Sequence, residues 1–254
     1  MRRVLVAFSG GVDSTLLLKT AADVLGGEVL AVIAASETYP RRETQEAERL
    51  AGRLGIRHRI IRTRELNNAA FTRNGTDRCY HCKRELFSRL KDMAAAESIP
   101  FVLDGQNEDD RSDYRPGSRA ARELGVRSPL QEAGLTKEEV RLLSRRLRLP
   151  NWNKPSLACL ASRFPYRESI DRQGLARVAA AEEFLLGLGL GQVRVRSHGR
   201  SARIEVEPQN ISRLAQPAFR AGIVRRLKAL GFIYITLDLQ GYRTGSLNEV
   251  LKRS

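Results

Sequence analysis

The chain has 254 residues, of which 42% are hydrophobic, so it is long enough for one large domain or for a large and a small one. No apolar run is long enough to cross a membrane, which excludes a membrane-spanning protein. The net charge of +15 indicates an anionic partner. Because Lys and Arg are spread along the whole chain rather than gathered in a tail, a nucleotide substrate is favoured over a nucleic acid.

The first part of the chain alternates strands with helices. An apolar strand at residues 3–8 leads into a glycine-containing loop and then into a helix at 13–25. The first eight residues resemble the start of a signal sequence, but the loop interrupts them and no small-residue cleavage site follows. We therefore expect a buried strand in a cytoplasmic protein. Further strands are expected at 29–35, 58–62 and 101–104, and further helices at 42–54, at 83–96 and from the capping box at Thr136 to Pro150.

The pattern changes after Pro150. Residues 151–169 are typical of a loop, and the rest of the chain mixes helices at 172–188 and 217–230 with short strands at 193–196, 202–207 and 232–239. The alternation before this point predicts a doubly wound α/β domain, with a mostly parallel sheet covered on both faces. We therefore expect two domains, an N-terminal α/β domain at 1–168 and a smaller C-terminal α+β domain at 169–254.

The loop after the first strand is the strongest functional signal. It runs from Ser9 to Ser14 with the sequence Ser-Gly-Gly-Val-Asp-Ser. Its glycines let the backbone approach an anion closely, and the free N–H groups at the start of the next helix point at that anion. The two serine hydroxyls can add hydrogen bonds, and Asp13 could hold a Mg²⁺ ion that bridges phosphates. Such a loop lies at the carboxyl end of a strand, where parallel sheets bind their ligands.

This loop lacks the lysine of the Walker A motif. It resembles instead the pyrophosphate loop (PP-loop) of the N-type ATP pyrophosphatases, a superfamily that includes GMP synthetase, NAD synthetase and tRNA-thiolating enzymes. The resemblance implies that ATP is cleaved between its α and β phosphates and that AMP passes to the substrate. The residues expected to bind ATP are Ser9, Gly10, Gly11, Val12, Asp13, Ser14, Ser36, Asp104 and Gly105.

The three cysteines are a second signal. Cys79 and Cys82 have the two-residue gap that lets two thiolates bind one metal centre, and Cys159 lies much further along the chain. Spacing alone leaves three interpretations open. They are an iron–sulfur cluster held by three thiolates with one iron left open, a zinc or thiol-redox site, and unconnected buried cysteines.

Five segments together resemble the LarE family over nearly the full length of the chain. LarE proteins are sulfur transferases that help to build the nickel-pincer nucleotide cofactor of lactate racemase. The resemblance implies adenylation of a carboxylate on pyridinium-3,5-biscarboxylic acid mononucleotide, after which sulfur displaces AMP and gives a thiocarboxylate. The segments that carry the resemblance are residues 77–83, 104–110, 113–117, 154–163 and 237–248.

Cys159 matches the position of the sulfur-bearing cysteine of this family. In members with a single cysteine, that residue gives up its own sulfur and becomes dehydroalanine. The additional Cys79 and Cys82 resemble the members that hold a [4Fe-4S] cluster with three cysteines, in which the open iron would carry an extra sulfide. The resemblance also implies a homo-oligomer such as a hexamer, and it leaves the physiological sulfur donor open.

Charged residues elsewhere complete the candidate site. Arg194 and Arg196 alternate along an expected strand, so both face one side, and they resemble the family's phosphate-binding pair. A solvated strand face is the alternative. Glu205 on the neighbouring strand could contact a metal or pair with Arg203. The remaining candidates, with a plain polar loop as their alternative, are Arg115 for phosphate and Asp109, Asp110 and Asp113 for Mg²⁺.

The main alternative function is that of a tRNA thiolase with the same loop chemistry, which would also explain the basic charge. We expect otherwise, because the loop begins at residue 9, before an RNA-binding module could be placed, and the chain has no further cysteine pairs for zinc ribbons. A nucleotide-binding regulator without catalysis would leave the three cysteines unexplained. The sequence thus predicts a sulfur transferase that uses ATP, Mg²⁺ and a [4Fe-4S] cluster, with no membrane or nucleic-acid partner.

Overall fold

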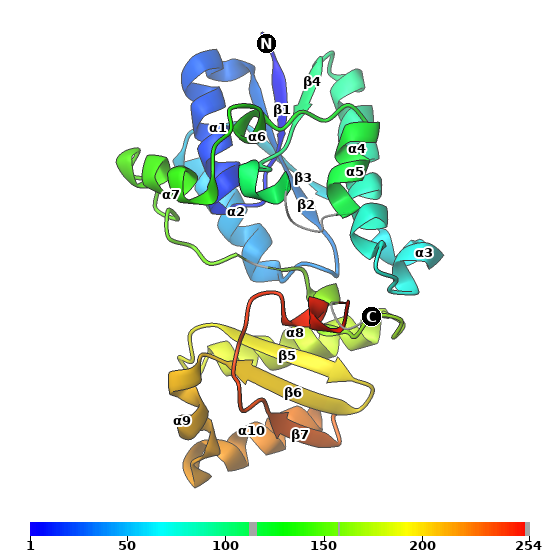
Figure 1. Ribbon diagram of the computed structural model, residues 1–254. Helices are drawn as coiled ribbons and strands as arrows, with labels where there is room; N and C mark the ends of the chain where they lie inside the picture. Colours follow the sequence, from blue (N-terminus) through cyan, green and yellow to red (C-terminus); the bar gives the residue numbers. More distant parts are fainter. Residues whose placement is uncertain (112–115, 157, 252–254) are drawn as a thin grey trace. The chain divides into compact units, whose positions relative to one another are not determined.

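The computed structural model describes residues 1–111, 116–156 and 158–251, which divide into two units (Figure 1). Unit 1 consists of Met1–Phe71 and Thr76–Ala158, and unit 2 consists of Thr72–Gly75 and Cys159–Ser254. No helix in the described part of the chain is both long and apolar enough to cross a membrane.

Unit 1 is built on a parallel sheet of four strands in the order β3-β2-β1-β4. The strands are β1 (Val4–Ala7), β2 (Val29–Ala35), β3 (His58–Arg62) and β4 (Phe101–Leu103). The chain moves from β1 outward to β2 and β3, and then returns to the other side of β1 for β4. This reversal opens a crevice beside the carboxyl end of β1, which is where sheets of this kind bind ligands. The parallel sheet predicted from the sequence is confirmed.

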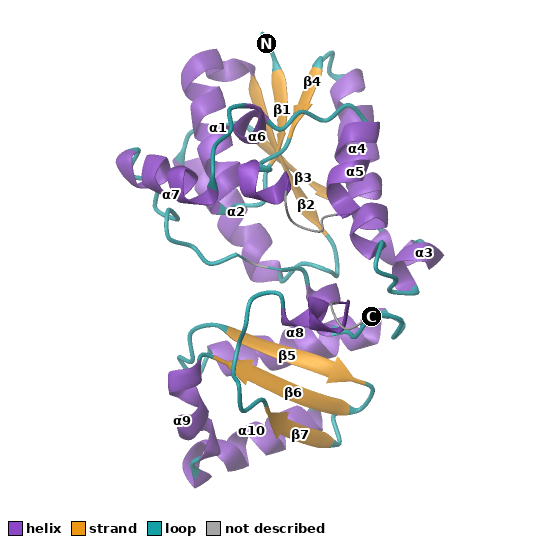
Figure 2. Ribbon diagram, viewed as in Figure 1, coloured by secondary structure: helices purple, strands orange, loops and turns teal. Residues whose placement is uncertain are grey.

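Alternate residues of the central strands serve two separate cores, as a parallel sheet with both faces covered requires. Val4 and Val6 face one core and Leu5 faces the other. Figure 2 shows helices on both faces of this sheet. The first core is formed with α1 (Val12–Leu25), α2 (Arg41–Arg53), α6 (Pro129–Glu132) and α7 (Lys137–Arg146), and the second with α4 (Arg78–Ala96) and α5 (Pro116–Glu123).

Two helix starts test the sequence-based boundaries in opposite ways. The predicted capping box is confirmed, because the Thr136 side chain accepts from Glu139 N and the Glu139 side chain accepts from Thr136 N. The helix expected at 83–96 starts earlier than predicted, because α4 begins at Arg78 and not at Lys83. Its buried residues already include Arg78, Tyr80 and Cys82, and the cysteine pair lies in the first turns of a helix and not in a loop.

Unit 2 has a three-stranded sheet in the order β5-β6-β7, with β5 and β6 antiparallel and β6 and β7 parallel. Along β5, Val193 and Val195 are buried, and the strand contacts α8. Arg194 and Arg196 alternate with them and therefore point to the opposite face. The elements are β5 (Val193–His198), β6 (Ser201–Val206), β7 (Tyr234–Leu237), α8 (Arg172–Leu186), α9 (Ile211–Ala215) and α10 (Pro217–Ala229).

The short segment Thr72–Gly75 belongs to unit 2, although the chain on both sides of it belongs to unit 1. It begins at the last residue of the single-turn helix α3 (Ala69–Thr72). Asn74 is fully buried and holds this segment in place. Its Nδ2 donates to the carbonyl oxygens of Pro165 at 2.7 Å and Glu168 at 2.9 Å, and its own carbonyl accepts from Arg167 N at 2.9 Å. Asn74 has a φ of 56°, a left-handed conformation that asparagine tolerates better than most residues.

Candidate active site

The glycine loop of unit 1 has a backbone that its sequence makes possible. Gly10 adopts a φ of +69°, and a Cβ at this position would lie 2.9 Å from the Cβ of Ala47 on α2. Any other residue would therefore meet both backbone strain and a steric clash. Gly11 is the N-cap of α1 and brings no side chain to cap the helix. The first N–H groups of a 14-residue helix thus face the crevice without a side-chain cap.

The two serines of the loop hold its ends together. Ser9 N donates to Ser14 Oγ at 3.3 Å, the two hydroxyl oxygens lie 3.1 Å apart, and Gly11 N donates to Ser9 Oγ at 3.3 Å. Ser14 Oγ can also donate to the Gly11 carbonyl at 3.2 Å. The loop therefore forms a small ring of hydroxyl and N–H groups at the start of α1, an arrangement suited to an anion.

The other expected ATP-binding residues lie on the same edge of the sheet. Ser36 follows β2 directly, and Asp104 and Gly105 follow β4. Gly105 abuts the loop, because a Cβ there would lie 2.9 Å from Ser14 N. The Asp104 carboxylate is buried and accepts hydrogen bonds from Ser128 Oγ at 2.7 Å and Gln106 Nε2 at 2.6 Å. The fold thus gathers these positions around the crevice, and their contact with ATP stays a prediction.

Asp13 is already engaged at this edge by residues that the sequence did not single out. Its Oδ1 accepts from Asn107 Nδ2 at 2.9 Å, and its Oδ2 forms an ion pair with Lys137 Nζ. Lys137 is the first residue of α7, where the helix dipole disfavours a cation. A lysine in that position was the one sequence signal that could have revealed the pair.

Asp109 and Asp110 already accept hydrogen bonds from backbone N–H groups. Asp110 Oδ2 accepts from Asn107 N and Asp109 Oδ2 accepts from Lys137 N, both at 3.0 Å. These contacts support the polar-loop interpretation of both residues. No group of three or more His, Cys, Asp and Glu in the described part of unit 1 is placed to hold a metal ion. Asp113 and Arg115 lie outside the described residues.

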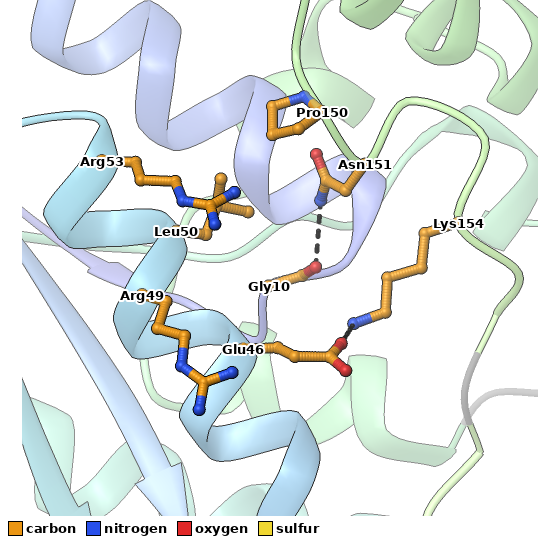
Figure 3. A pocket seen from close by; sticks show the side chains of 8 residues that line it. All are labelled: Gly10, Glu46, Arg49, Leu50, Arg53, Pro150, Asn151 and Lys154. Carbon is orange, nitrogen blue, oxygen red and sulfur yellow. Dashed lines mark hydrogen bonds and ion pairs between the residues drawn. The ribbon is translucent and has the colours of Figure 1, made fainter. Parts of the chain in front are cut away.

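A cavity of about 200 Å³ adjoins the loop on the side of Gly10 (Figure 3). Lys154 lines it and places its ammonium group 2.7 Å from Glu43 Oε2 and 2.9 Å from Glu46 Oε2. Burial lowers the pKa of Lys154, but the hydrogen bonds to Glu43 and Glu46 outweigh this effect and raise it. The other lining residues are Gly10, Glu46, Arg49, Leu50, Arg53, Pro150 and Asn151.

Cys79 and Cys82 lie three residues apart at the start of α4, so they are neighbours on one side of that helix. Cys79 is exposed and Cys82 is buried. The Cys82 thiol donates to Glu65 Oε1 at 3.9 Å, and Tyr39 Oη lies 4.0 Å from its sulfur. A helix N-terminus favours thiolates, which are the form of cysteine that binds metals.

Cys159 belongs to unit 2, where a buried ion pair holds its backbone. Arg163 is 2% exposed and forms two hydrogen bonds with the carboxylate of Glu182, at 2.8 and 2.9 Å. Its remaining nitrogen donates to the Cys159 carbonyl at 3.1 Å and to Ser162 Oγ at 2.8 Å. The Arg163 guanidinium therefore fixes the residue that the family resemblance assigns to sulfur transfer.

Arg194 and Arg196 share a strand face, as expected, but their surroundings differ. Arg196 forms a bidentate pair with Glu205 at 3.0 and 2.8 Å and also donates to the Ser162 carbonyl and to Ser246 Oγ. Glu205 accepts a further bond from Arg203, as the charge-pair interpretation expects. Arg196 and Glu205 thus satisfy one another.

Arg194 is buried next to this network and is not satisfied. Its Nη1 donates to the Val193 carbonyl at 2.8 Å, and its guanidinium lies 5.2 Å from the ring centre of Tyr242. Its Nη2 is buried with no hydrogen-bond partner among the described residues. Burial, followed by the nearby charge of Arg163, lowers the pKa of Arg194. A buried cation with an unused donor is a site that attracts an anion.

Comparison with known proteins places this geometry in a family. The sequence profile of the NAD synthase family matches residues 1–95, which contain the loop, β1 to β3 and the cysteine pair. An uncharacterized protein of Synechocystis is 47% identical over 251 residues, covering 99% of this chain and 94% of that protein. An uncharacterized protein of Methanocaldococcus jannaschii is 26% identical over 243 residues, covering 96% of this chain and 92% of that protein.

A third relative has a named activity. The pyridinium-3,5-bisthiocarboxylic acid mononucleotide synthase of Lactiplantibacillus plantarum is 43% identical over 255 residues, which cover 100% of this chain and 92% of the synthase. The likeness therefore extends through both units and is not confined to the nucleotide-binding part. The chain belongs to the LarE family, of which this synthase is a member, and its first unit is a PP-loop domain.

Proposed function

We propose that this chain is an ATP-dependent sulfur transferase that converts a carboxylate of a pyridinium mononucleotide into a thiocarboxylate. The observation that carries the proposal is the 43% identity, over the whole chain, to a protein named for the bisthiocarboxylic acid product. A product with two thiocarboxylates implies a precursor with two carboxylates, pyridinium-3,5-biscarboxylic acid mononucleotide. A carboxylate resists substitution until one oxygen becomes part of a good leaving group, which is what ATP supplies.

In the first step, a carboxylate oxygen attacks the α-phosphorus of ATP and the bond to the bridging oxygen breaks. Pyrophosphate leaves and an acyl adenylate forms. The N–H groups at the start of α1 and the hydroxyls of Ser9 and Ser14 suit the leaving pyrophosphate. The partly exposed carboxylate of Asp13 is an oxygen ligand of the kind that Mg²⁺ prefers. Bound there with the phosphates, Mg²⁺ would neutralise their developing charge.

The substrate phosphate is the anion that we assign to Arg194. Its unused Nη2 is a charge-assisted donor inside unit 2, and such donors suit the oxygens of a phosphate. The sequence predicted that Arg196 also binds the phosphate. In the structure, however, Arg196 donates to Glu205, Ser162 and Ser246. We therefore propose that Arg196 acts by holding the strand face beside Arg194 in place.

In the second step, sulfur attacks the carbonyl carbon of the acyl adenylate, and the bond to the AMP oxygen breaks. If the sulfur is that of Cys159, the product is still attached to the protein as a thioester. Removal of the Cα proton of Cys159 and cleavage of its Cβ–S bond then release the thiocarboxylate and leave dehydroalanine. Each molecule would act once by this route.

A reusable enzyme would need a second source of sulfur, and the cysteine pair of α4 fits one. Cys79 and Cys82 are neighbouring thiols at a helix N-terminus, so their chemistry suits thiolate ligands of iron. We propose that they and Cys159 hold a [4Fe-4S] cluster. Such a cluster would supply an iron with an open position for an exchangeable sulfide. The convergence of the three sulfurs, and assembly into a homo-oligomer such as a hexamer, stay predictions.

The activity is tested by incubating the protein with ATP, Mg²⁺ and pyridinium-3,5-biscarboxylic acid mononucleotide, and by analysing the products by mass spectrometry. We expect AMP, pyrophosphate and a thiocarboxylate. The Asp13→Ala variant should be folded but should release no pyrophosphate, because the loop region loses its metal-binding carboxylate. Pyrophosphate release from the variant at the wild-type rate, or thiolation of bulk tRNA in place of the mononucleotide, would contradict the proposal.

The two sulfur routes are separated by the Cys79→Ala variant after anaerobic reconstitution with iron and sulfide. If a cluster supplies the sulfur, this variant should lose both bound iron and repeated turnover. If Cys159 is the donor, the variant should keep its activity, and the wild-type protein should lose the mass of one sulfur at Cys159 in each turnover. Iron content and intact-protein mass therefore give opposite results for the two routes.

A further inference from the structure

One of the side chains that line the cavity beside Gly10, that of Asn151, has no role in the steps described so far. Asn151 lies in the segment that follows α7, and its Nδ2 donates to the Gly10 carbonyl at 3.0 Å. The same Nδ2 donates to Thr15 Oγ1 at 2.9 Å. Gly10 precedes the N-cap residue Gly11, and Thr15 lies in the first turn of α1, so one amide group contacts the chain on both sides of the N-cap. Figure 3 shows the Asn151 amide directed at the Gly10 carbonyl.

The first bond sets the orientation of one peptide group. A peptide is planar and trans, so its carbonyl oxygen and its N–H point in opposite directions. When Asn151 draws the Gly10 carbonyl to itself, the N–H of Gly11 is turned toward the inside of the loop. There it donates to Ser9 Oγ. Gly10 needs such a restraint more than other residues do, because glycine has the widest choice of backbone conformations.

The second bond acts on the orientation of the next peptide group through the hydroxyl of Thr15. Thr15 is fully buried, and its hydroxyl donates to the Gly11 carbonyl at 2.7 Å while it accepts from Asn151. By the same geometry, holding the Gly11 carbonyl back directs the N–H of Val12 toward the crevice. The Gly11 carbonyl also accepts from Thr15 N at 3.0 Å and from Ser14 Oγ at 3.2 Å. Asn151 therefore holds the first carbonyl directly and reinforces the hold on the second through Thr15.

The amide of Asn151 can serve this role in one orientation only. If its oxygen and nitrogen were exchanged, the oxygen would face the Gly10 carbonyl, and two acceptors would repel each other. The observed orientation leaves Oδ1 buried without a hydrogen-bond partner among the described residues. The donor contacts to the loop are thus what holds this side chain.

The segment that carries Asn151 is itself anchored to unit 1. Lys154 joins it to Glu43 and Glu46 on α2. Arg141 on α7 donates to the Lys154 carbonyl at 3.3 Å. Contacts with two helices therefore hold the backbone just after Asn151 and support its amide against the loop.

We propose that Asn151 is a positioning residue for ATP, which keeps the N–H groups of Gly11 and Val12 turned toward the phosphates. This inference rests on the proposed use of the loop for ATP. Without Asn151, the Gly10 carbonyl would lose its donor, and the Gly10–Gly11 peptide would keep only the longer bond from Gly11 N to Ser9 Oγ. Only a fraction of the molecules would then have a loop that can bind phosphate. The apparent affinity for a ligand falls in proportion to that fraction, while the bound state is unchanged.

The test compares Asn151→Ala and Asn151→Asp with wild-type protein by pyrophosphate release at varied ATP. The aspartate variant keeps the shape of the side chain and lacks the donor. We expect KM for ATP to rise about ten-fold in both variants, with kcat at saturating ATP nearly unchanged. The melting temperature should change little. Asn153→Ala, two residues away, removes an exposed contact with Arg141 and serves as the matched control with a wild-type KM.

Three results would overturn the proposal. They are a wild-type KM in Asn151→Asp, a fall in kcat with KM unchanged, and a rise in KM in Asn153→Ala equal to that in Asn151→Ala. Wild-type protein that does not cleave ATP at all would instead contradict the proposed function. The two failures are therefore distinguishable in the same experiment.

Discussion

The two units both gather hydrogen-bond donors at one place, but they use different parts of the polypeptide. In unit 1 the donors are N–H groups of the loop Ser9–Ser14, and the helix that follows has no side-chain cap. In unit 2 the donors are guanidinium groups, and most of them are already paired with carboxylates or carbonyls. The N–H groups of the loop are therefore available to an anion, whereas on the charged face of unit 2 the unused donor described above is the buried Nη2 of Arg194.

The difference shows how each region would fail. A backbone site depends on conformations that few residues can adopt, so a single methyl group can damage it. A buried charge network depends on every partner being present, so the loss of one carboxylate leaves an uncompensated cation. The loop should thus lose function before stability, and the network should lose stability first.

The largest effect is expected from Glu182→Ala. This change leaves Arg163 buried without its carboxylate and removes the acceptor of Val195 N. The free energy of unfolding should fall by about 3–5 kcal/mol. Urea unfolding followed by circular dichroism measures it. The adjacent Glu183 is exposed, and Glu183→Ala should change the same quantity by less than about 0.5 kcal/mol. Equal effects of the two substitutions would show that Arg163 does not depend on Glu182.

The next effect concerns the loop. Gly10→Ala forces an alanine into a left-handed conformation and against Ala47, at a cost of about 1–3 kcal/mol from backbone strain alone. We expect kcat/KM for ATP to fall about ten-fold to a hundred-fold. Adding Ala47→Gly should restore part of the activity, because it removes the clash and not the strain. Gly52→Ala, on α2 with open space around it, is the control that should leave kcat/KM unchanged.

Two arginine variants test whether Arg194 binds substrate while Arg196 stabilises unit 2. Arg194→Ala should weaken substrate binding by about 1.5–3 kcal/mol, as for a charge-assisted bond, with ATP binding and stability unchanged. Arg196→Ala should instead lower the free energy of unfolding, because Glu205 is buried and loses its bidentate partner. Calorimetric titration and urea unfolding of both variants measure the two quantities. If both variants lose substrate affinity and keep full stability, Arg196 is a phosphate ligand as the sequence suggested.

The smallest effect is a pH dependence at the start of α7. The hydrogen bond from the Thr136 backbone N–H, and then that from its hydroxyl, lowers the pKa of Glu139 below its usual 4.5. A carboxyl whose pKa is depressed on folding contributes stability above its unfolded pKa, and this contribution is lost as the pH falls through the folded value. Glu139→Gln should therefore lower the melting temperature slightly at pH 7, and this difference should shrink as the pH falls below 4.5. A constant difference across that range would contradict this account.

The parts of the site that the sequence could predict are those that depend on neighbouring residues. The strand, the glycine turn and the helix of the loop are contiguous, and so is the capping box of Thr136. The partners of these groups are not. Lys137 reaches Asp13 from 124 positions along the chain. Such a contact follows from how helices pack on the sheet, which no local pattern records.

In unit 2, too, the sequence predicted where the charged side chains lie but not which of them pair. The alternation of Arg194 and Arg196 correctly predicted a shared face. It did not predict that Glu205, which lies directly across from Arg194 in the strand register, gives both carboxylate oxygens to Arg196. The choice between two equivalent partners is made by the surrounding groups, here the Ser162 carbonyl and Ser246, which also accept from Arg196.

Because the segment Thr72–Gly75 belongs to unit 2, no single cut in the chain separates the two units. A protein expressed from residues 159–254 alone would lack Asn74, and the carbonyl oxygens of Pro165 and Glu168 would lose the donor that joins them. A second unit taken from a relative would keep this contact only if the segment Thr72–Gly75 supplies the same donor, Asn74. Because the acceptors are main-chain oxygens, which every residue carries, the contact depends on Asn74 and not on which side chains stand at positions 165 and 168. Sequence variation should therefore be restricted at position 74 and not at these two positions, about ninety residues away.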